Sequence, residues 1–145
     1  MDETKKVTYA DKDASWEIYV ELNTKMTTQL ITQSYNNKSR TGDTRSALTS
    51  IYSIFPETRL ILKQYGLIGK QFARLAFEML NTVIRPFTTK WHGLSIRMDK
   101  IHFDEYYDLK FQEDLKQLQS DLAPYVAKFL EMANTKDKLL DKVEE

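Results

Sequence analysis

The sequence predicts an all-α fold: a four- to five-helix bundle with proline-kinked helices, in which residues 1–145 form a single helical domain. Apolar residues recur at spacings of three and four along most of the chain, as they do on one face of a helix. Glycine (four residues) and proline (three) are scarce, so the chain offers few turns. Its 145 residues, 41% of them hydrophobic, are enough to bury one core.

The first helix is expected after a flexible segment at residues 1–8. Asp11 or Asp13 can cap it, because a carboxylate accepts hydrogen bonds from the N–H groups of the first turn. An apolar stripe that includes Trp16 then continues as far as the polar segment 34–43. That segment is rich in Asn, Ser, Lys and Gly, and we expect it to form a loop.

The second helix is expected to begin at Asp43 or Thr44. Pro56 interrupts its pattern, because proline lacks an N–H and clashes with the preceding turn. It therefore either kinks this helix or begins a new one. The apolar stripe resumes in the run 60–62, and Gly66 is expected to end the helix.

The third helix, from Ile68 to Phe87, is the most apolar element and is expected at the centre of the bundle. Pro86 is expected to kink or end it, and Gly93 to close the segment. Residues 94–103 alternate apolar and polar side chains, but a lone strand has no pairing partner. We therefore expect an ordered connector there.

Asp104 is expected to cap the last helix, whose apolar residues follow a spacing close to 3.5. The stripe runs through Asp108 or Phe111, Leu115, Leu118, Leu122, Tyr125 or Val126, and Phe129. Pro124 is expected to bend this helix. The charged residues 136–145 are expected to fray, so they and residues 1–8 form the flexible ends of the domain.

Composition excludes several classes of protein. The chain has no cysteine, which rules out disulfides and cysteine-ligated zinc or iron–sulfur sites. It contains neither a Gly-rich phosphate loop nor a G-x-S-x-G elbow, and two histidines cannot supply the E-x-x-H pairs of a di-iron bundle. Glu17 and Glu21 lie four apart, but beside Lys25 a solvated surface is the preferred interpretation. No metal and no cofactor are therefore expected.

The chain shows no apolar run long enough to span a bilayer, because Lys, Arg or Glu breaks every apolar segment. Its polar first residues do not resemble a secretory leader. We therefore expect no membrane insertion and a cytoplasmic location.

Formal net charge is zero, but the charges are unevenly distributed. Residues 1–58 carry a net charge of −1, residues 59–100 carry +6 and residues 101–145 carry −5. A basic middle segment packed beside an acidic last helix is the preferred interpretation, and an anion-binding face is the alternative. The alternative implies binding of nucleotide or nucleic-acid phosphate, although the pI of about 6.7 is low for a dedicated nucleic-acid binder.

The densest cluster of reactive side chains runs from Arg85 to His92. On a continuous helix these two residues lie two turns apart and project from one face, with Lys90 as a third cationic group nearby. An arginine that stabilises phosphate charge and a histidine that moves protons can together cleave RNA through its own 2′-hydroxyl. In the preferred alternative Arg85 and Lys90 cover a helix end, Trp91 anchors the turn and His92 caps it.

The Arg-x6-His spacing resembles the Arg-x4–6-His signature of the HEPN ribonucleases, which are also all-helical bundles of similar length. The resemblance implies a metal-independent ribonuclease in which Arg85 and His92 are catalytic and a dimer completes the site. That family usually has Asn, Asp or His directly after its arginine, where this chain has Pro86.

Trp16 and Tyr19 form the other conspicuous segment. Core anchors with hydrogen-bonded polar tips are the preferred interpretation, and a recognition face is the alternative. The segments W-x2-Y-x-E-L-x-T and R-P-F-x2-K-W-H, which begin at Trp16 and Arg85, resemble small uncharacterised bacterial helical proteins. Some of those proteins occur beside mobile-element or anti-phage genes.

The expected function is a non-catalytic helical interaction module, or a small subunit of a larger bacterial-type assembly, that binds another protein or self-associates. This expectation rests on the missing catalytic motifs, the aromatic content of 12% and the segregated charge. The candidate binding residues are Lys70, Arg74, Arg85, Lys90, Trp91, Trp16 and Tyr19. The alternatives are a ribonuclease that uses Arg85 and His92, and phosphate binding by the central basic segment.

Overall fold

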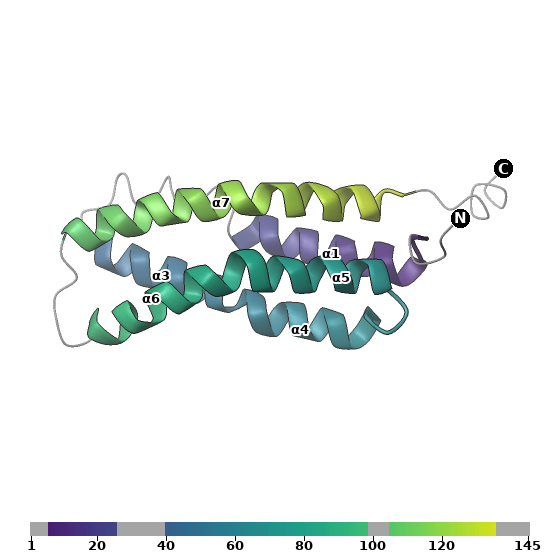
Figure 1. The fold of residues 1–145 in the computed structure, drawn as a ribbon, viewed down its shortest axis with the longest axis horizontal. Helices are drawn as coiled ribbons and strands as arrows, with labels where there is room; N and C mark the ends of the chain where they lie inside the picture. The colour runs from purple at the N-terminus through teal and green to yellow at the C-terminus, as the bar shows by residue number, and fades with distance from the viewer. Residues whose placement is uncertain (1–5, 26–39, 99–104, 136–145) are drawn as a thin grey trace.

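The computed structural model describes residues 6–25, 40–98 and 105–135, and every regular element in these ranges is helical. The elements are α1 (Tyr9–Lys25), α3 (Arg40–Tyr52), α4 (Ile54–Tyr65), α5 (Lys70–Met79), the π-helical turn η2 (Leu80–Ile84), α6 (Arg85–Met98) and α7 (Glu105–Ala133). Because α3 runs into α4, and α5 runs through η2 into α6, the described residues form four antiparallel rods (Figure 1). The predicted all-α bundle is confirmed.

Helix α1 begins two residues earlier than the first predicted cap. Thr8 is its cap: the Thr8 Oγ1 accepts a hydrogen bond from the Asp11 N–H (3.2 Å), and Asp11 Oδ2 accepts one from the Thr8 N–H (2.9 Å). The Phe72 N–H, in the first turn of α5, donates to Asp11 Oδ1 (2.8 Å). One buried carboxylate therefore satisfies backbone donors at the start of two helices.

The α3–α4 rod shows how the chain accommodates Pro56. Helix α3 begins at Arg40, earlier than predicted, and the break at Ser53 makes Pro56 the third residue of α4. A proline is tolerated there, because the first turn of a helix leaves its N–H groups without intrahelical partners. Helix α4 ends at Tyr65 with Gly66 as its C-cap, as predicted.

The α5–α6 rod continues through Pro86. The Pro86 ring would clash with the carbonyl four residues earlier in a regular α-helix. The turn η2 precedes the ring, and there the Arg85 N–H donates to the carbonyl of Leu80, five residues back. This wider turn accommodates the ring without ending the helix.

The predicted end at Gly93 is wrong, because α6 continues to Met98. A side chain at Gly93 would meet nothing within 4 Å, so this glycine lies on an open face of the helix and breaks nothing. Residues 94–98, expected as a connector, are helical, since a helix satisfies its own backbone groups without a partner strand.

Several sequence predictions lie outside the described residues. They are the end of the first helix, residues 34–39 of the predicted loop at 34–43, the connector at 99–103, the Asp104 cap and the tail at 136–145. Of the predicted N-terminal segment, only residues 6–8 are described. In the part of the chain that is described, no helix is both long and apolar enough to cross a membrane.

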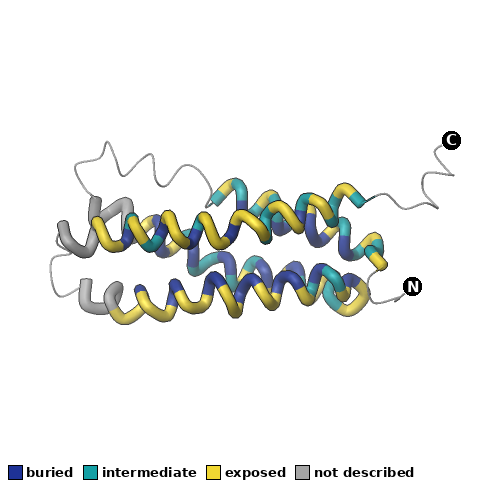
Figure 2. The backbone as a smooth tube through the Cα atoms, turned by 45° about the horizontal axis from the view of Figure 1, so that its top comes forward, coloured by how far each residue is buried: buried dark blue, intermediate teal, exposed yellow. Residues whose placement is uncertain are grey.

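The core lies along the axis between the rods, toward which the buried residues of each rod face (Figure 2). Its largest fully buried side chains are Trp91, Phe72, Phe111, Phe129, Ile18, Leu22, Ile51, Ile54, Met79, Ile84 and Leu115. The predicted stripe of the last helix faces the core. Phe111, Leu115, Leu118, Leu122 and Phe129 are buried, and Tyr125 and Val126 are partly buried against them. Pro124 lies inside α7, on its exposed side.

Candidate functional site

Arg85 and His92 both lie on α6 and both face the α3–α4 rod. The Arg85 guanidinium lies over the Phe55 ring, 5.7 Å from its centroid, and Arg85 Nε donates to Asn81 Oδ1 (3.2 Å). His92 stands edge-on to the Tyr52 ring, with the two centroids 6.1 Å apart. Seven residue steps separate Arg85 and His92, a rise of about 10 Å along the helix axis.

The His92 ring is held by a short chain of hydrogen bonds. Its Nδ1 lies 3.2 Å from the Tyr52 hydroxyl, which donates its proton to the Thr88 carbonyl (3.0 Å). Since that hydroxyl has only one proton, Nδ1 of His92 is the donor in its own contact. Burial raises the pKa of the Tyr52 hydroxyl, which keeps the hydroxyl protonated in this role.

Lys90 and Trp91 face α7 instead. The Lys90 ammonium pairs with Asp114 Oδ2 at 2.6 Å, and the Trp91 indole N–H donates to the same oxygen at 3.1 Å. Trp91 is fully buried against Phe111, so it is a core residue, and its prediction as a binding residue is wrong. A single helix face cannot hold the whole cluster, because five residue steps turn the helix by roughly 140°.

Lys70 and Arg74 are exposed on α5, four residues apart and on one face. In an uninterrupted α-helix Arg74 and Arg85 would also share a face. The π-helical turn between them takes up one extra residue, which rotates α6 by about 100°. The structure therefore divides the predicted basic face between α5, the α3–α4 side of α6 and the α7 side of α6.

Trp16 lies outside the core. Its side chain is 54% exposed, and its ring stacks on Tyr19 with centroids 5.6 Å apart. The buried face of α1 is formed instead by small and aliphatic residues that include Ala14, Ile18 and Leu22. The interpretation of Trp16 as a core anchor is therefore wrong, and the alternative of a recognition face remains open.

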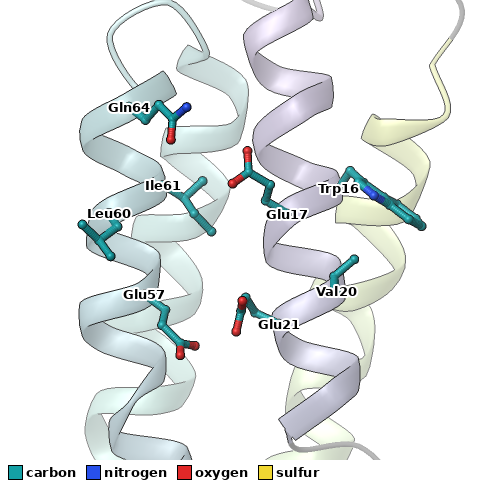
Figure 3. Close-up of a pocket in the computed structure, with 8 residues that line it drawn as sticks. All are labelled: Trp16, Glu17, Val20, Glu21, Glu57, Leu60, Ile61 and Gln64. Atoms are coloured by element: carbon teal, nitrogen blue, oxygen red, sulfur yellow. The ribbon is translucent and has the colours of Figure 1, made fainter.

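Trp16 lines an open groove between α1 and α4 (Figure 3). The groove encloses about 470 Å³. Helix α1 supplies Trp16, Glu17, Val20 and Glu21, and α4 supplies Glu57, Leu60, Ile61 and Gln64. Leu60 is 67% exposed, and it is one of several large apolar side chains that are exposed in the described residues. We call this feature the α1–α4 groove.

Three carboxylates give the α1–α4 groove a negative potential. Glu17, Glu21 and Glu57 all line it, and their side chains reach in from both helices (Figure 3). A hydrogen bond to Glu17 raises the pKa of the nearby Tyr65 hydroxyl, and burial and the charges of Glu17 and Asp13 raise it further. The negative potential therefore extends beyond the groove toward the start of α1.

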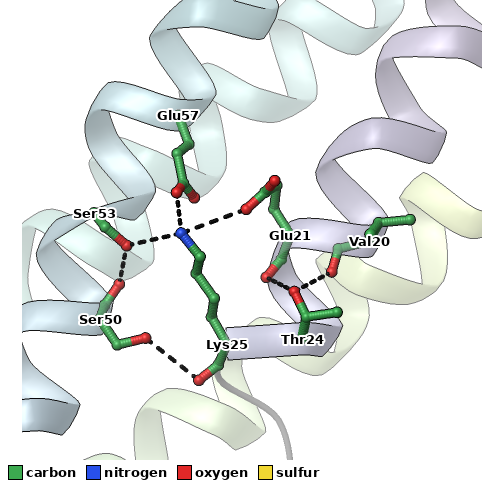
Figure 4. Close-up of polar contacts among 7 residues, drawn as sticks. All are labelled: Val20, Glu21, Thr24, Lys25, Ser50, Ser53 and Glu57. Carbon is green, nitrogen blue, oxygen red and sulfur yellow. Dashed lines mark hydrogen bonds and ion pairs between the residues drawn. The ribbon is translucent and has the colours of Figure 1, made fainter.

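Lys25 closes one end of the groove (Figure 4). Its ammonium pairs with Glu57 Oε1, lies 3.5 Å from Glu21 Oε2 and donates to Ser53 Oγ at 3.3 Å. One ammonium against three carboxylates leaves the groove with a net negative charge. In the described ranges no group of three or more His, Cys, Asp or Glu residues is placed to hold a metal ion.

Comparison with known proteins found no match to a protein-family model, to a curated protein or to a solved structure. The sequence singled out Trp16 and Tyr19 and indicated a solvated surface at Glu17 and Glu21, but it did not point to Leu60 or Glu57. One local signal was present. Three consecutive apolar residues at 60–62 cannot all face inward on a helix, because each step turns the chain by about 100°.

Proposed function

We propose that this protein is a non-catalytic helical interaction module, or a small subunit of a larger assembly, that binds another protein through the α1–α4 groove. The observation that carries the proposal is the pair of large apolar side chains on opposite sides of the groove, Trp16 (54% exposed) and Leu60 (67% exposed). Large exposed apolar side chains beside polar groups are typical of protein-binding sites, and tryptophan is enriched at their hot spots.

The physical gain from covering this groove is substantial. Burying a fully exposed leucine side chain contributes about 1.5–3 kcal/mol, and most of that remains available at Leu60. Trp16 is held by its stack on Tyr19, so less rotamer entropy is lost when a partner covers it. Both side chains stand on helices of the bundle, which makes the surface preorganised.

Site-specific photocrosslinking tests the proposal. A photoreactive residue at position 60 is expected to capture a partner in cells, whereas one at Leu109, exposed to 51% on α7, is not. The captured protein is identified and purified, and its affinity is measured. Leu60→Ala and Trp16→Ala are expected to weaken binding about tenfold or more, and the matched variant Leu109→Ala to leave it unchanged. Equal effects at positions 60 and 109 contradict the proposal.

RNA cleavage is a second candidate, favoured by one observation. Helix α6 continues through Pro86, so Arg85 and His92 lie on one face two turns apart. Purified protein is incubated with labelled single-stranded RNA in the presence of a metal chelator. Cleavage that is lost in Arg85→Ala and His92→Ala but kept in Lys116→Ala, a variant at an exposed position on α7, supports an enzyme. Intact RNA with the parent protein rejects it.

A further inference from the structure

The α1–α4 groove carries carboxylates between its two helices and apolar side chains along its outer edges (Figure 3). Trp16 and Val20 come from α1, and Leu60 and Ile61 come from α4. The carboxylates stand among these side chains, so any segment that covers the apolar surface must also meet negative charge. A partner side chain that brought another carboxylate here would face repulsion in a partly desolvated site.

The acidic groups retain unused capacity to accept hydrogen bonds. Glu57 Oε1 accepts from Lys25, but the buried Oε2 of the same carboxylate has no hydrogen-bond partner in the structure. Glu17 has only the Tyr65 hydroxyl as a described donor, and a phenol does not neutralise its charge. A cationic donor of the kind found on Lys and Arg side chains would satisfy Glu17, whereas the buried Oε2 of Glu57 lies out of a partner's reach.

The dimensions of the groove suit a helix. Its lining residues on α4 run from 57 to 64, which is about 10 Å of helix and therefore two turns. The two walls are antiparallel helices, and a third helix can lie along the groove between them (Figure 3). Such a helix would present apolar anchors at positions i, i+3 or i+4, and i+7.

We propose that the partner segment that occupies the α1–α4 groove is a basic amphipathic helix, whose apolar side chains cover Trp16 and Leu60 and whose Lys or Arg side chains pair with Glu17 and Glu21. This inference rests on the proposed function and specifies the chemistry of the partner. A second copy docked by the same groove fits worse, because a two-fold axis brings the same acidic patches together.

Designed peptides test the inference directly. One peptide of about 18 residues carries leucines at i, i+3, i+4 and i+7 with lysines elsewhere, and the other has glutamate in place of every lysine. Neither contains an aromatic residue. Since Trp91 is fully buried, a blue shift of tryptophan emission on binding reports Trp16. The lysine peptide is expected to bind at least about tenfold more tightly than the glutamate peptide, and less tightly at high salt.

Variants with matched controls locate the interaction. Glu17→Gln and Glu21→Gln are each expected to weaken binding of the lysine peptide about three- to fivefold, as exposed charge pairs do. Glu131→Gln, at an exposed position on α7, is the control and is expected to change nothing. Leu60→Ala is expected to lower the affinity about tenfold, and Leu109→Ala to leave it unchanged.

Three outcomes overturn the inference. The first is equal binding of the two peptides, the second is equal weakening by Glu17→Gln and Glu131→Gln, and the third is no binding of the lysine peptide. If the crosslink at position 60 still captures a partner, the proposed function stands and only the partner's chemistry is wrong. A dimer in sedimentation analysis that Leu60→Ala dissociates identifies a second copy as the occupant, and that outcome also overturns the inference.

Discussion

The carboxylate of Asp11 accepts hydrogen bonds at the start of both α1 and α5, and its removal tests how these two helices are joined. Asp11→Ala deletes the acceptor of the Phe72 N–H at the start of α5 and of the Thr8 N–H at the start of α1. Asp11 is almost fully buried, and the bond to Phe72 is buried, so water does not readily replace the carboxylate.

The magnitude follows from the donors left behind. A buried donor that loses its partner costs about 1–3 kcal/mol, and the Phe72 N–H lies at the upper part of that range because it is fully enclosed. The Thr8 N–H is partly buried and contributes about 1 kcal/mol, the usual value of a helix cap. We therefore expect Asp11→Ala to lower the free energy of unfolding by about 3 kcal/mol.

Asp11→Asn is expected to have an intermediate effect on stability, because an amide keeps one acceptor oxygen and turns an N–H donor toward the other backbone N–H. It is expected to lower the free energy of unfolding by about half as much as Asp11→Ala does. Urea unfolding followed by circular dichroism measures both variants. The matched control is Asp13→Ala, at an exposed position in the same turn, with an expected change within about 0.5 kcal/mol. If Asp11→Ala lowers the free energy of unfolding by less than about 1 kcal/mol, the Asp11 carboxylate does not stabilise the starts of both helices as described.

Three further predictions concern other parts of the bundle. Trp91→Phe removes the bond to Asp114 and leaves a void, so urea unfolding should show a loss of about 2 kcal/mol. Gly69→Ala places a Cβ 3.1 Å from the backbone of α1, and thermal unfolding should show a loss of about 1–2 kcal/mol. The pKa of Tyr65 is raised, so its stabilising contribution is complete below the ordinary tyrosine pKa of about 10 and is lost as the pH rises above it. Glu17→Gln should lower that pKa in a tyrosinate absorbance titration.

Each of these measurements has an outcome that contradicts its reasoning. A Trp91→Phe variant as stable as the parent would show that the indole N–H adds nothing to the core. An unchanged melting temperature for Gly69→Ala would show that α1 and the α5 start can separate without cost. If Glu17→Gln leaves the titration of Tyr65 unmoved, the hydrogen bond between these two residues is not the main cause of the raised pKa.

The helices were predictable where a single apolar stripe determines which side chains are buried. They were less predictable where the low helix propensity of a residue competes with tertiary packing. The stripe of α7 could be followed from Phe111 to Phe129 because a helix packed in a bundle repeats its contacts every three or four residues. The passage of α6 through Gly93 was missed because propensity favours an end at glycine, and at Pro86 the sequence left a kink and an end as alternatives. Tertiary packing overrides this propensity: the buried Trp91 lies between those two positions and holds the helix against α7.

The candidate site was harder to predict, because residues that are close in sequence do not necessarily lie on the same face of a helix. The cluster from Arg85 to His92 is compact in sequence, yet the structure turns Lys90 toward α7 and leaves Arg85 and His92 facing the α3–α4 rod. The α1–α4 groove has the opposite character, since about 40 residues separate Trp16 from Leu60, and only the packing of α1 on α4 brings them together. An apolar stripe about 100° wide can bury only part of the run 60–62, so the exposure of one of its residues follows from helix geometry. Which residue that is depends on the neighbouring helix, and here the neighbour leaves Leu60 open beside three carboxylates.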